Sequence, residues 1–168
     1  NKIIFTNYRL FMAIVGPSGS GKTRLIYSML ASPTTFSPPI EKTYYFYKEY
    51  QPLFKEMSEK LGIEFIPCLD FKMIKNLENC MLIFDDSWEE IYQEKEFVKL
   101  AVACTHKKVQ CIFVKHNLFH QSKWSRTIDL NKTHVVLFKS LRDLQQIDHF
   151  GRQLEQKGHI STIWSPLD

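Results

Sequence analysis

The chain has 168 residues, of which 44% are hydrophobic and 24% charged, and its formal net charge is +4. We therefore expect one soluble domain over residues 1–168 and no membrane partner, because no apolar run reaches the roughly 20 residues that a membrane-spanning helix needs. The four cysteines (Cys68, Cys80, Cys104 and Cys111) lack the spacing of metal ligands, which excludes a zinc site and predicts free thiols in a reducing, intracellular compartment.

The first predicted elements enclose a glycine-rich loop. Residues 16–23 match the pattern G-x-x-x-x-G-K-[ST] at every fixed position, with an apolar run at 11–15 before them and a helix-compatible stretch at 24–31 after them. A chance glycine-rich turn, the alternative interpretation, would not need these flanks. Three glycines let the N–H groups of the loop point inward, and the helix that starts at Lys22 adds the positive end of its dipole. We therefore predict a phosphate-binding loop made of Gly16, Pro17, Ser18, Gly19, Ser20, Gly21, Lys22 and Thr23.

Within this loop, two side chains have predicted chemical roles. The Lys22 ammonium can reach the β- and γ-phosphates of a nucleotide, and the Thr23 hydroxyl can ligate Mg²⁺.

The rest of the chain alternates strands with helices. After a proline-rich surface loop at Ser32–Glu41, we predict strands at Lys42–Tyr47, Ile63–Pro67, Met81–Phe84, Val109–Val114 and His134–Phe138. We predict helices at Gln51–Leu61, Glu89–Cys104 and Leu141–Lys157. This alternation predicts an α/β fold, a three-layer α/β/α sandwich of the P-loop NTPase type with a mostly parallel central sheet. Ligands of such sheets bind at the carboxyl ends of the strands.

Two adjacent acids follow the buried strand at 81–84. Asp85 is the predicted carboxylate of the Mg²⁺ site beside Thr23, and Asp86 can act as the general base that activates a water. Glu89 is the alternative base, and an Asp-Asp-Ser cap of the next helix is the alternative structural interpretation. The strand at 42–47 is inserted between the loop and these acids along the chain. An inserted strand is typical of the RecA-like branch of P-loop proteins, which hydrolyses nucleotides, rather than of the kinase–GTPase branch.

Polar residues also follow the predicted strand at 109–114. Asn117 is the candidate sensor of the γ-phosphate or of the attacking water, and His116 is its rival. A lone histidine at a strand end is more often a hydrogen-bonded surface group, which leaves both assignments open.

The C-terminal third is basic. Between positions 107 and 157 it has ten Lys or Arg against four Asp or Glu. This excess indicates either an ordinary solvated surface or a surface for an anionic partner such as a nucleic-acid backbone.

Three further blocks carry a resemblance to a known family. They are Asn-Leu-Phe-His-Gln at 117–121, Ser-Arg-Thr-Ile-Asp-Leu-Asn at 125–131 and Phe-Lys-Ser-Leu-Arg-Asp at 138–143. Together with the phosphate loop and Asp85-Asp86, and in this order, they resemble the genome-packaging ATPases of the FtsK–HerA superfamily. Those of polinton/Maverick elements, adintoviruses and poxviruses are the most similar, and the resemblance spans residues 10–150.

The resemblance implies a function and partners. It implies an ATPase that uses ATP and Mg²⁺, assembles as a pentameric or hexameric homo-oligomeric ring, and moves double-stranded DNA into a capsid, with capsid or portal proteins as further partners. The expected location is then the nucleus or cytoplasm of a host cell, at the site of virus assembly. Arg126 and Arg142 are the candidates for an arginine finger that acts on a neighbouring subunit, and an ordinary surface ion pair is the alternative for each. The residues expected to face DNA phosphates are Lys107, Lys108, Lys123 and Lys132.

Two other functions fit the phosphate loop. A small P-loop kinase would usually have an arginine-rich lid and lack the paired acids, so Asp85 and Asp86 speak against it. A nucleotide-gated binding or assembly module would bind nucleotide without turnover.

Overall fold

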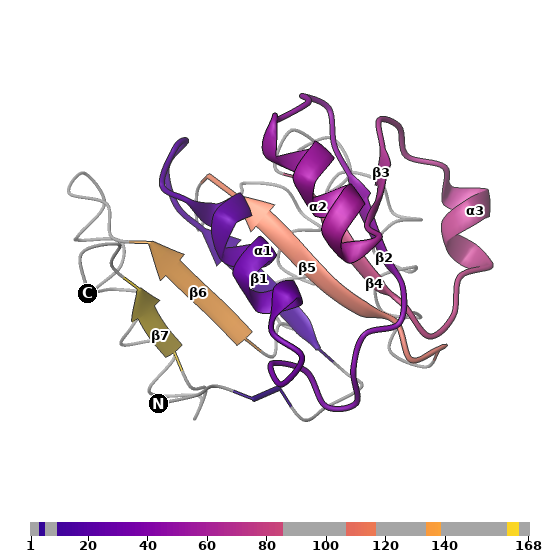
Figure 1. Cartoon of the computed structure of the whole chain (residues 1–168), viewed down its shortest axis with the longest axis horizontal. Helices are drawn as coiled ribbons and strands as arrows, with labels where there is room; N and C mark the ends of the chain where they lie inside the picture. Colours follow the sequence, from indigo (N-terminus) through magenta and orange to yellow (C-terminus); the bar gives the residue numbers. More distant parts are fainter. Residues whose placement is uncertain (1–3, 6–9, 86–106, 117–133, 139–160, 165–168) are drawn as a thin grey trace, which may run out of the picture.

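The computed structural model describes residues 4–5, 10–85, 107–116 and 134–138, together with the backbone of Ser161–Trp164 (Figure 1). The described helices are α1 (Lys22–Ala31), α2 (Leu53–Leu61) and α3 (Phe71–Lys75). The described strands are β1 (Phe11–Val15), β2 (Thr43–Phe46), β3 (Glu64–Ile66), β4 (Met81–Phe84), β5 (Gln110–Lys115), β6 (His134–Phe138) and β7 (Ser161–Trp164).

The described strands form one sheet in the order β3-β2-β4-β5-β1-β6-β7, and every neighbouring pair is parallel. The strands can be followed side by side in Figure 1. This architecture confirms the predicted α/β fold with a parallel sheet. Because the strands run the same way, all of their carboxyl ends meet at one edge of the sheet.

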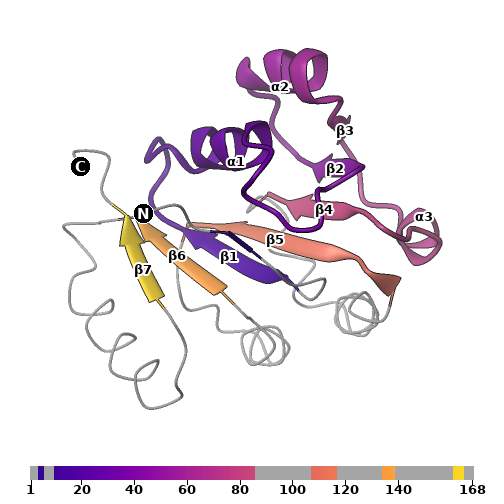
Figure 2. The same cartoon turned by 60° about the horizontal axis from the view of Figure 1, so that its bottom comes forward.

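The sheet is covered on both faces, which explains why its strands read as continuous apolar runs. On one face, Met12 and Ile14 of β1 share a buried cluster with Ile26 of α1 and with Phe54 and Met57 of α2. Figure 2 shows α1 and α2 on the same side of the sheet. Burial of each such side chain stabilises the fold by about 1.5–3 kcal/mol.

The opposite face is built from the alternate residues of the same strands. Phe11, Phe84 and Phe113 pack there with Ile74, which belongs to the short helix α3. Side chains alternate between the two faces of a strand, so Phe11 and Met12 belong to different layers. The described residues thus supply helices to both faces of the sheet.

Several details differ from the sequence-based expectations. The predicted boundaries are one or two residues too wide for β2, α2 and β3, and β5 begins and ends one residue later than expected. Helix α3 and strand β7 were not predicted. The helices expected at Glu89–Cys104 and Leu141–Lys157 lie outside the described residues.

The connection between α1 and β2 is less exposed than expected. It has no helix or strand, as predicted, but Phe36 is only 6% exposed and forms an isolated parallel bridge with Phe5.

The position of one strand requires a correction. Along the chain, the strand at 42–47 lies between the phosphate loop and Asp85, but in the sheet β5 separates β1 from β4, and β2 lies on the far side of β4. Long parallel crossovers allow a strand that is late in the sequence to take a central place. The inserted strand expected of the RecA-like branch is therefore β5.

Candidate functional site

The predicted phosphate loop joins the end of β1 to the start of α1. The Gly16 N–H donates to the carbonyl of Lys115 at 3.0 Å, which ties the start of the loop to the end of β5. Within the loop, the Ser20 N–H donates to the Pro17 carbonyl at 3.2 Å, and the Leu25 N–H donates to the Gly21 carbonyl at 2.9 Å. The loop is therefore held at both ends by backbone hydrogen bonds.

Two glycines of the loop are needed for different reasons. A Cβ atom at Gly16 would lie 2.6 Å from the Cβ of Phe138 and 2.9 Å from the Oγ of Ser20, so only glycine fits this close approach. Gly19 has open space around it but a φ of +73°, a conformation that other residues adopt only with strain. The second fixed glycine of the pattern G-x-x-x-x-G-K-[ST] is Gly21, whose φ of +96° also favours glycine, so the pattern reflects both packing and backbone geometry.

Lys22 is folded back against the loop. Its side chain is 7% exposed, and its Nζ donates to the carbonyl oxygens of Gly16 at 2.7 Å and Pro17 at 2.8 Å. The same Nζ lies 3.4 Å from the Nδ1 of His116, at the end of β5. A cation is therefore fixed at the mouth of the loop.

Helix α1 adds a second source of positive potential. It has ten residues, no acidic residue in its first turn, and no side-chain cap at Gly21. The N–H groups of the first turn and the positive end of the helix dipole favour a bound anion at this position.

Asp85 directly follows β4 and is partly buried. Its N–H donates to the carbonyl of Phe46 at 3.1 Å, which holds it against the end of β2. The phenol of Tyr45 lies beside Asp85 and is fully buried. Burial raises the pKa of Tyr45 above its ordinary value, and the neighbouring Asp85 carboxylate raises this pKa further, whereas the Thr23 hydroxyl lowers it. The Tyr45 ring therefore lies beside both predicted Mg²⁺ ligands.

The Tyr45 hydroxyl makes no well-formed hydrogen bond to any described residue. Its ring packs against Phe54 and Phe65, at centroid distances of 4.9 and 5.1 Å. These ring contacts position Tyr45 beside the site.

These groups converge on one cavity of about 690 Å³, a volume typical of small-molecule sites. The loop contributes Ser18, Gly19, Gly21, Lys22 and Thr23, and the neighbouring strand ends contribute Asp85 and His116. The structure therefore places the described part of the predicted site at one edge of the sheet.

The remaining predicted residues divide into two groups. Gly16, Pro17 and Ser20 complete the loop. Asp86, Asn117, Arg126 and Arg142, and the alternative base Glu89, lie outside the described residues, so their roles stay predictions. Of the two rival sensors, His116 is described, and it lines the cavity beside Lys22.

Sequence reasoning missed the part of the cavity wall that follows β2. Glu49, Gln51 and Leu53 line the cavity, as does Arg24 of α1. The corner at 48–52 matches no motif. One signal was present, because Glu49 is a carboxylate shortly after an apolar strand, as Asp85 is.

The described basic residues of the C-terminal third differ in exposure. Lys107 and Lys108 are exposed, but they lie before β5, at the amino end of the sheet. Lys115 is 2% exposed and therefore does not belong to a surface for a partner. The other basic residues between Lys123 and Lys157 lie outside the described part of the chain.

Several solved structures share this fold. The genome packaging NTPase B204 from Sulfolobus turreted icosahedral virus 2, in complex with AMP, has a TM-score of 0.56 at 12% identity, over 90% of this chain and 87% of that chain. The ATP-gammaS complex of the same protein gives 0.53 at 14% identity, over 94% and 90%. Flagellar accessory protein FlaH from Methanocaldococcus jannaschii gives 0.55 at 15% identity, over 79% and 72%.

These similarities define the class of fold. No protein-family model and no curated protein sequence matches the chain. The chain has the α/β fold of P-loop NTPases, as the sequence predicted, and its resemblance to packaging ATPases extends to that fold. Membership of the FtsK–HerA superfamily stays a prediction. Within the described residues, no helix combines the length and apolar character needed to cross a membrane.

Proposed function

We propose that the chain is a Mg²⁺-dependent ATPase whose turnover drives double-stranded viral DNA into a capsid. The observation that carries the proposal is the position of Lys22. This buried cation sits at the mouth of a glycine loop, in the same cavity as Thr23 and Asp85. A phosphate chain in this cavity would meet a fixed cation, loop N–H groups and a helix N-terminus.

The oxygen donors of the cavity fit a magnesium ion. Thr23 offers a hydroxyl and Asp85 a carboxylate, and Mg²⁺ is usually held by one or two such oxygens together with phosphate oxygens and water. When bound, the ion neutralises charge on the β- and γ-phosphates. Thr23 and Asp85 would hold it, and the Tyr45 hydroxyl lies beside both of these side chains.

The protein side chains divide the remaining tasks. Lys22 neutralises charge on the γ-phosphate, and His116 or Asn117 contacts that phosphate or the attacking water. A carboxylate must also take a proton from the water, and Asp86 is the candidate that the sequence supplies. Arg126 or Arg142 of a neighbouring subunit would complete the site.

The DNA-packaging part of the proposal depends on the sequence blocks and on the fold. The blocks at 117–121, 125–131 and 138–143 resemble packaging ATPases, and B204, which shares the fold, is named a genome packaging NTPase. We expect a pentameric or hexameric ring of this chain, with Lys107, Lys108, Lys123 and Lys132 towards DNA phosphates and with capsid or portal proteins as further partners.

ATP hydrolysis by the assembled chain tests this proposal. We expect Mg²⁺-dependent phosphate release that duplex DNA stimulates and that needs no acceptor substrate. Transfer of the γ-phosphate to a small molecule would show a kinase instead. Nucleotide binding without turnover, in every assembly state and with DNA present, would show a nucleotide-gated module.

A further inference from the structure

Two loops leave neighbouring strands side by side at the edge of the sheet that carries the phosphate loop. Strands β2 and β4 are paired in parallel with Phe46 opposite Phe84, so the residues that follow them emerge together. The hydrogen bond from the Asp85 N–H to the Phe46 carbonyl, at 3.1 Å, joins the two strand ends. The chain after β2 therefore starts beside the predicted metal ligand.

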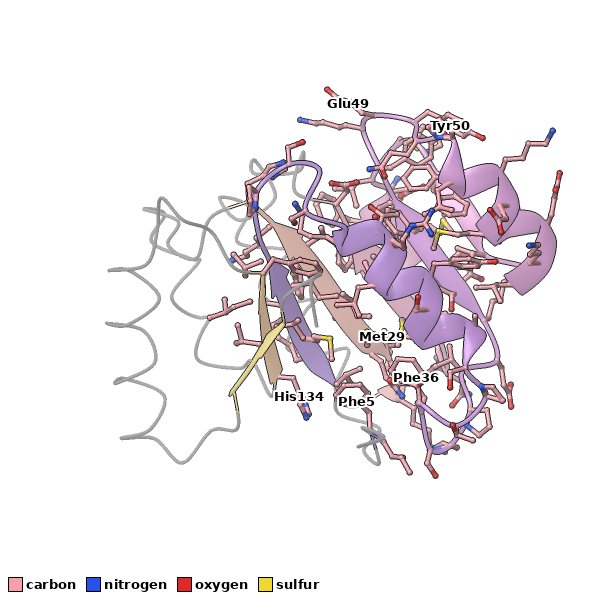
Figure 3. The ribbon with its side chains drawn as sticks, turned by 60° about the vertical axis from the view of Figure 1, so that its left-hand side comes forward. Phe5, Met29, Phe36, Glu49, Tyr50 and His134 are labelled. Carbon is pink, nitrogen blue, oxygen red and sulfur yellow. The ribbon has the colours of Figure 1, made fainter. Side chains whose placement is uncertain are left out.

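Glu49 lies in this chain segment and lines the same cavity as Lys22 and Thr23. Figure 3 shows Glu49 at the end of the molecule where the loop between β1 and α1 also lies. Among the described residues, Asp85 and Glu49 are the carboxylates of this cavity. Asp85 reaches it from β4, and Glu49 reaches it from the loop after β2.

The corner that carries Glu49 is anchored on both sides. Before it, the Tyr47 N–H donates to the Ile66 carbonyl at 3.0 Å. After it, Tyr50 packs edge-on against Phe54 at a centroid distance of 5.7 Å, and Tyr47 contacts the same ring at 5.3 Å. These contacts hold the backbone of the corner while the Glu49 side chain remains exposed. An anchored backbone with a water-exposed carboxylate suits a group that must receive and release a proton.

We propose that Glu49, in place of the sequence candidate Asp86, is the general base of the hydrolysis. The inference rests on the proposed ATPase function. As the water oxygen bonds to the γ-phosphorus, one water proton passes to the Glu49 carboxylate. The bond between the γ-phosphorus and the bridging oxygen breaks, and its electron pair stays on the ADP. Glu49 then releases the proton to solvent.

The charges in the cavity favour Asp85 as the metal ligand and Glu49 as the general base. A carboxylate beside a divalent cation is a weak base, because the cation stabilises its ionised form. Asp85 occupies that position. Glu49 follows a different strand, β2, and is accessible to water. It can therefore accept a proton while Asp85 stays bound to the metal ion.

Single-turnover hydrolysis at saturating Mg·ATP tests the proposal. Glu49→Gln removes the basic oxygen at nearly constant volume, and we expect a rate about 10²- to 10⁴-fold lower, with the affinity for a fluorescent ATP analogue unchanged. Glu59→Gln, which removes an exposed carboxylate from α2, is the matched control and should keep the wild-type rate.

A chemical rescue separates a base from a merely structural residue. Glu49→Ala should regain part of its lost rate when formate is added, because a small carboxylate can take the place of the missing side chain. The same addition should not accelerate Lys22→Ala. Loss of rate without any rescue would overturn the assignment of Glu49 as a base.

The outcomes also separate this inference from the proposed function. If Glu49→Gln keeps the wild-type rate while Asp86→Asn loses it, Asp86 is the base and the ATPase function stands. If the wild-type chain hydrolyses no ATP in any assembly state, the proposed function fails and the role of Glu49 fails with it.

Discussion

At the carboxyl end of the sheet, Lys22, Asp85 and Glu49 line one cavity, whereas at the amino end the connections are closed by aromatic rings. There Phe5 stacks on Phe36 at 5.6 Å and meets His134 edge-on at 5.0 Å. Figure 3 shows these three rings at the end of the molecule opposite to Glu49.

Strands β1, β2, β4 and β5 are buried along their whole length, so they do not themselves distinguish one end from the other. The difference lies in how the chain connects them. At the carboxyl end of β1 the chain turns into the N-terminus of α1, which exposes N–H groups and favours anions. At the amino end, the loop after α1 returns to the sheet and buries Phe36. The molecule therefore has a reactive end and a closing end. The reactive end comprises residues 16–23 with Glu49, Asp85 and His116, and the closing end comprises Phe5, Phe36 and His134.

Replacement of Lys22 should have the largest effect on the reactive end. We expect Lys22→Ala to abolish ATP turnover and to weaken nucleotide binding severely, because no other described cation lies within the loop. Phosphate release and binding of a fluorescent ATP analogue measure both effects. Lys55→Ala, an exposed lysine of α2, is the control, and full ATPase activity of Lys22→Ala would refute the site.

Replacement of Phe36 should act on the closing end alone. Its side chain is 6% exposed, and we expect Phe36→Ala to lower the free energy of unfolding by about 3 kcal/mol through the cavity it leaves. Denaturant unfolding measures this loss, with Phe36→Leu as the volume-conserving control. Nucleotide affinity of the folded fraction should stay at the wild-type value, and a large drop in that affinity would break the separation of the two ends.

Replacement of two glycines of the loop by alanine should lower the free energy of unfolding by smaller amounts, which differ between the two positions. Gly16→Ala forces a Cβ to within 2.6 Å of Phe138, and we expect a loss of about 1–3 kcal/mol in unfolding free energy together with weaker nucleotide binding. Gly19→Ala meets no atom within 4 Å and should cost only about 1 kcal/mol of backbone strain. Equal effects on thermal unfolding would mean that close packing against β6 does not shape the loop.

The smallest expected effect is a dependence of stability on pH at the closing end. Burial lowers the pKa of His134 below its ordinary value of 6.5. Protonation therefore favours the unfolded chain, so this contribution to stability is complete above pH 6.5 and is lost as the pH falls below it. His134→Phe should flatten the pH dependence of the melting temperature in that range. An unchanged pH profile would show that the imidazole is not the titrating group.

The extent to which the sequence predicted this molecule follows from the kind of signal that each part carries. The strands around Met12, Ile83 and Val136 were predicted because apolar runs indicate strands covered on both faces. Helix α3 was missed because it has only five residues, although Asp70 caps it with hydrogen bonds to the N–H groups of Lys72 and Met73.

For the site, the motif predicted the loop because its residues have fixed spacing along the chain, and the apolar strand at 81–84 predicted Asp85 as the carboxylate at its end. Glu49 has no such spacing to either of them. It reaches the cavity only because β2 pairs with β4, and strand order was not predicted. The position of β5 between β1 and β4 was missed for the same reason. Strand pairing depends on packing over long crossovers rather than on local sequence.

Amide chemical-shift mapping of the chain on addition of ATP-gammaS and Mg²⁺ tests most directly the claim that the carboxyl end is the nucleotide site. We predict large shifts at Gly19, Lys22, Glu49, Asp85 and His116, and none at Phe5, Phe36 or His134. Shifts confined to the amino end, or no shifts at saturating nucleotide, would contradict the account.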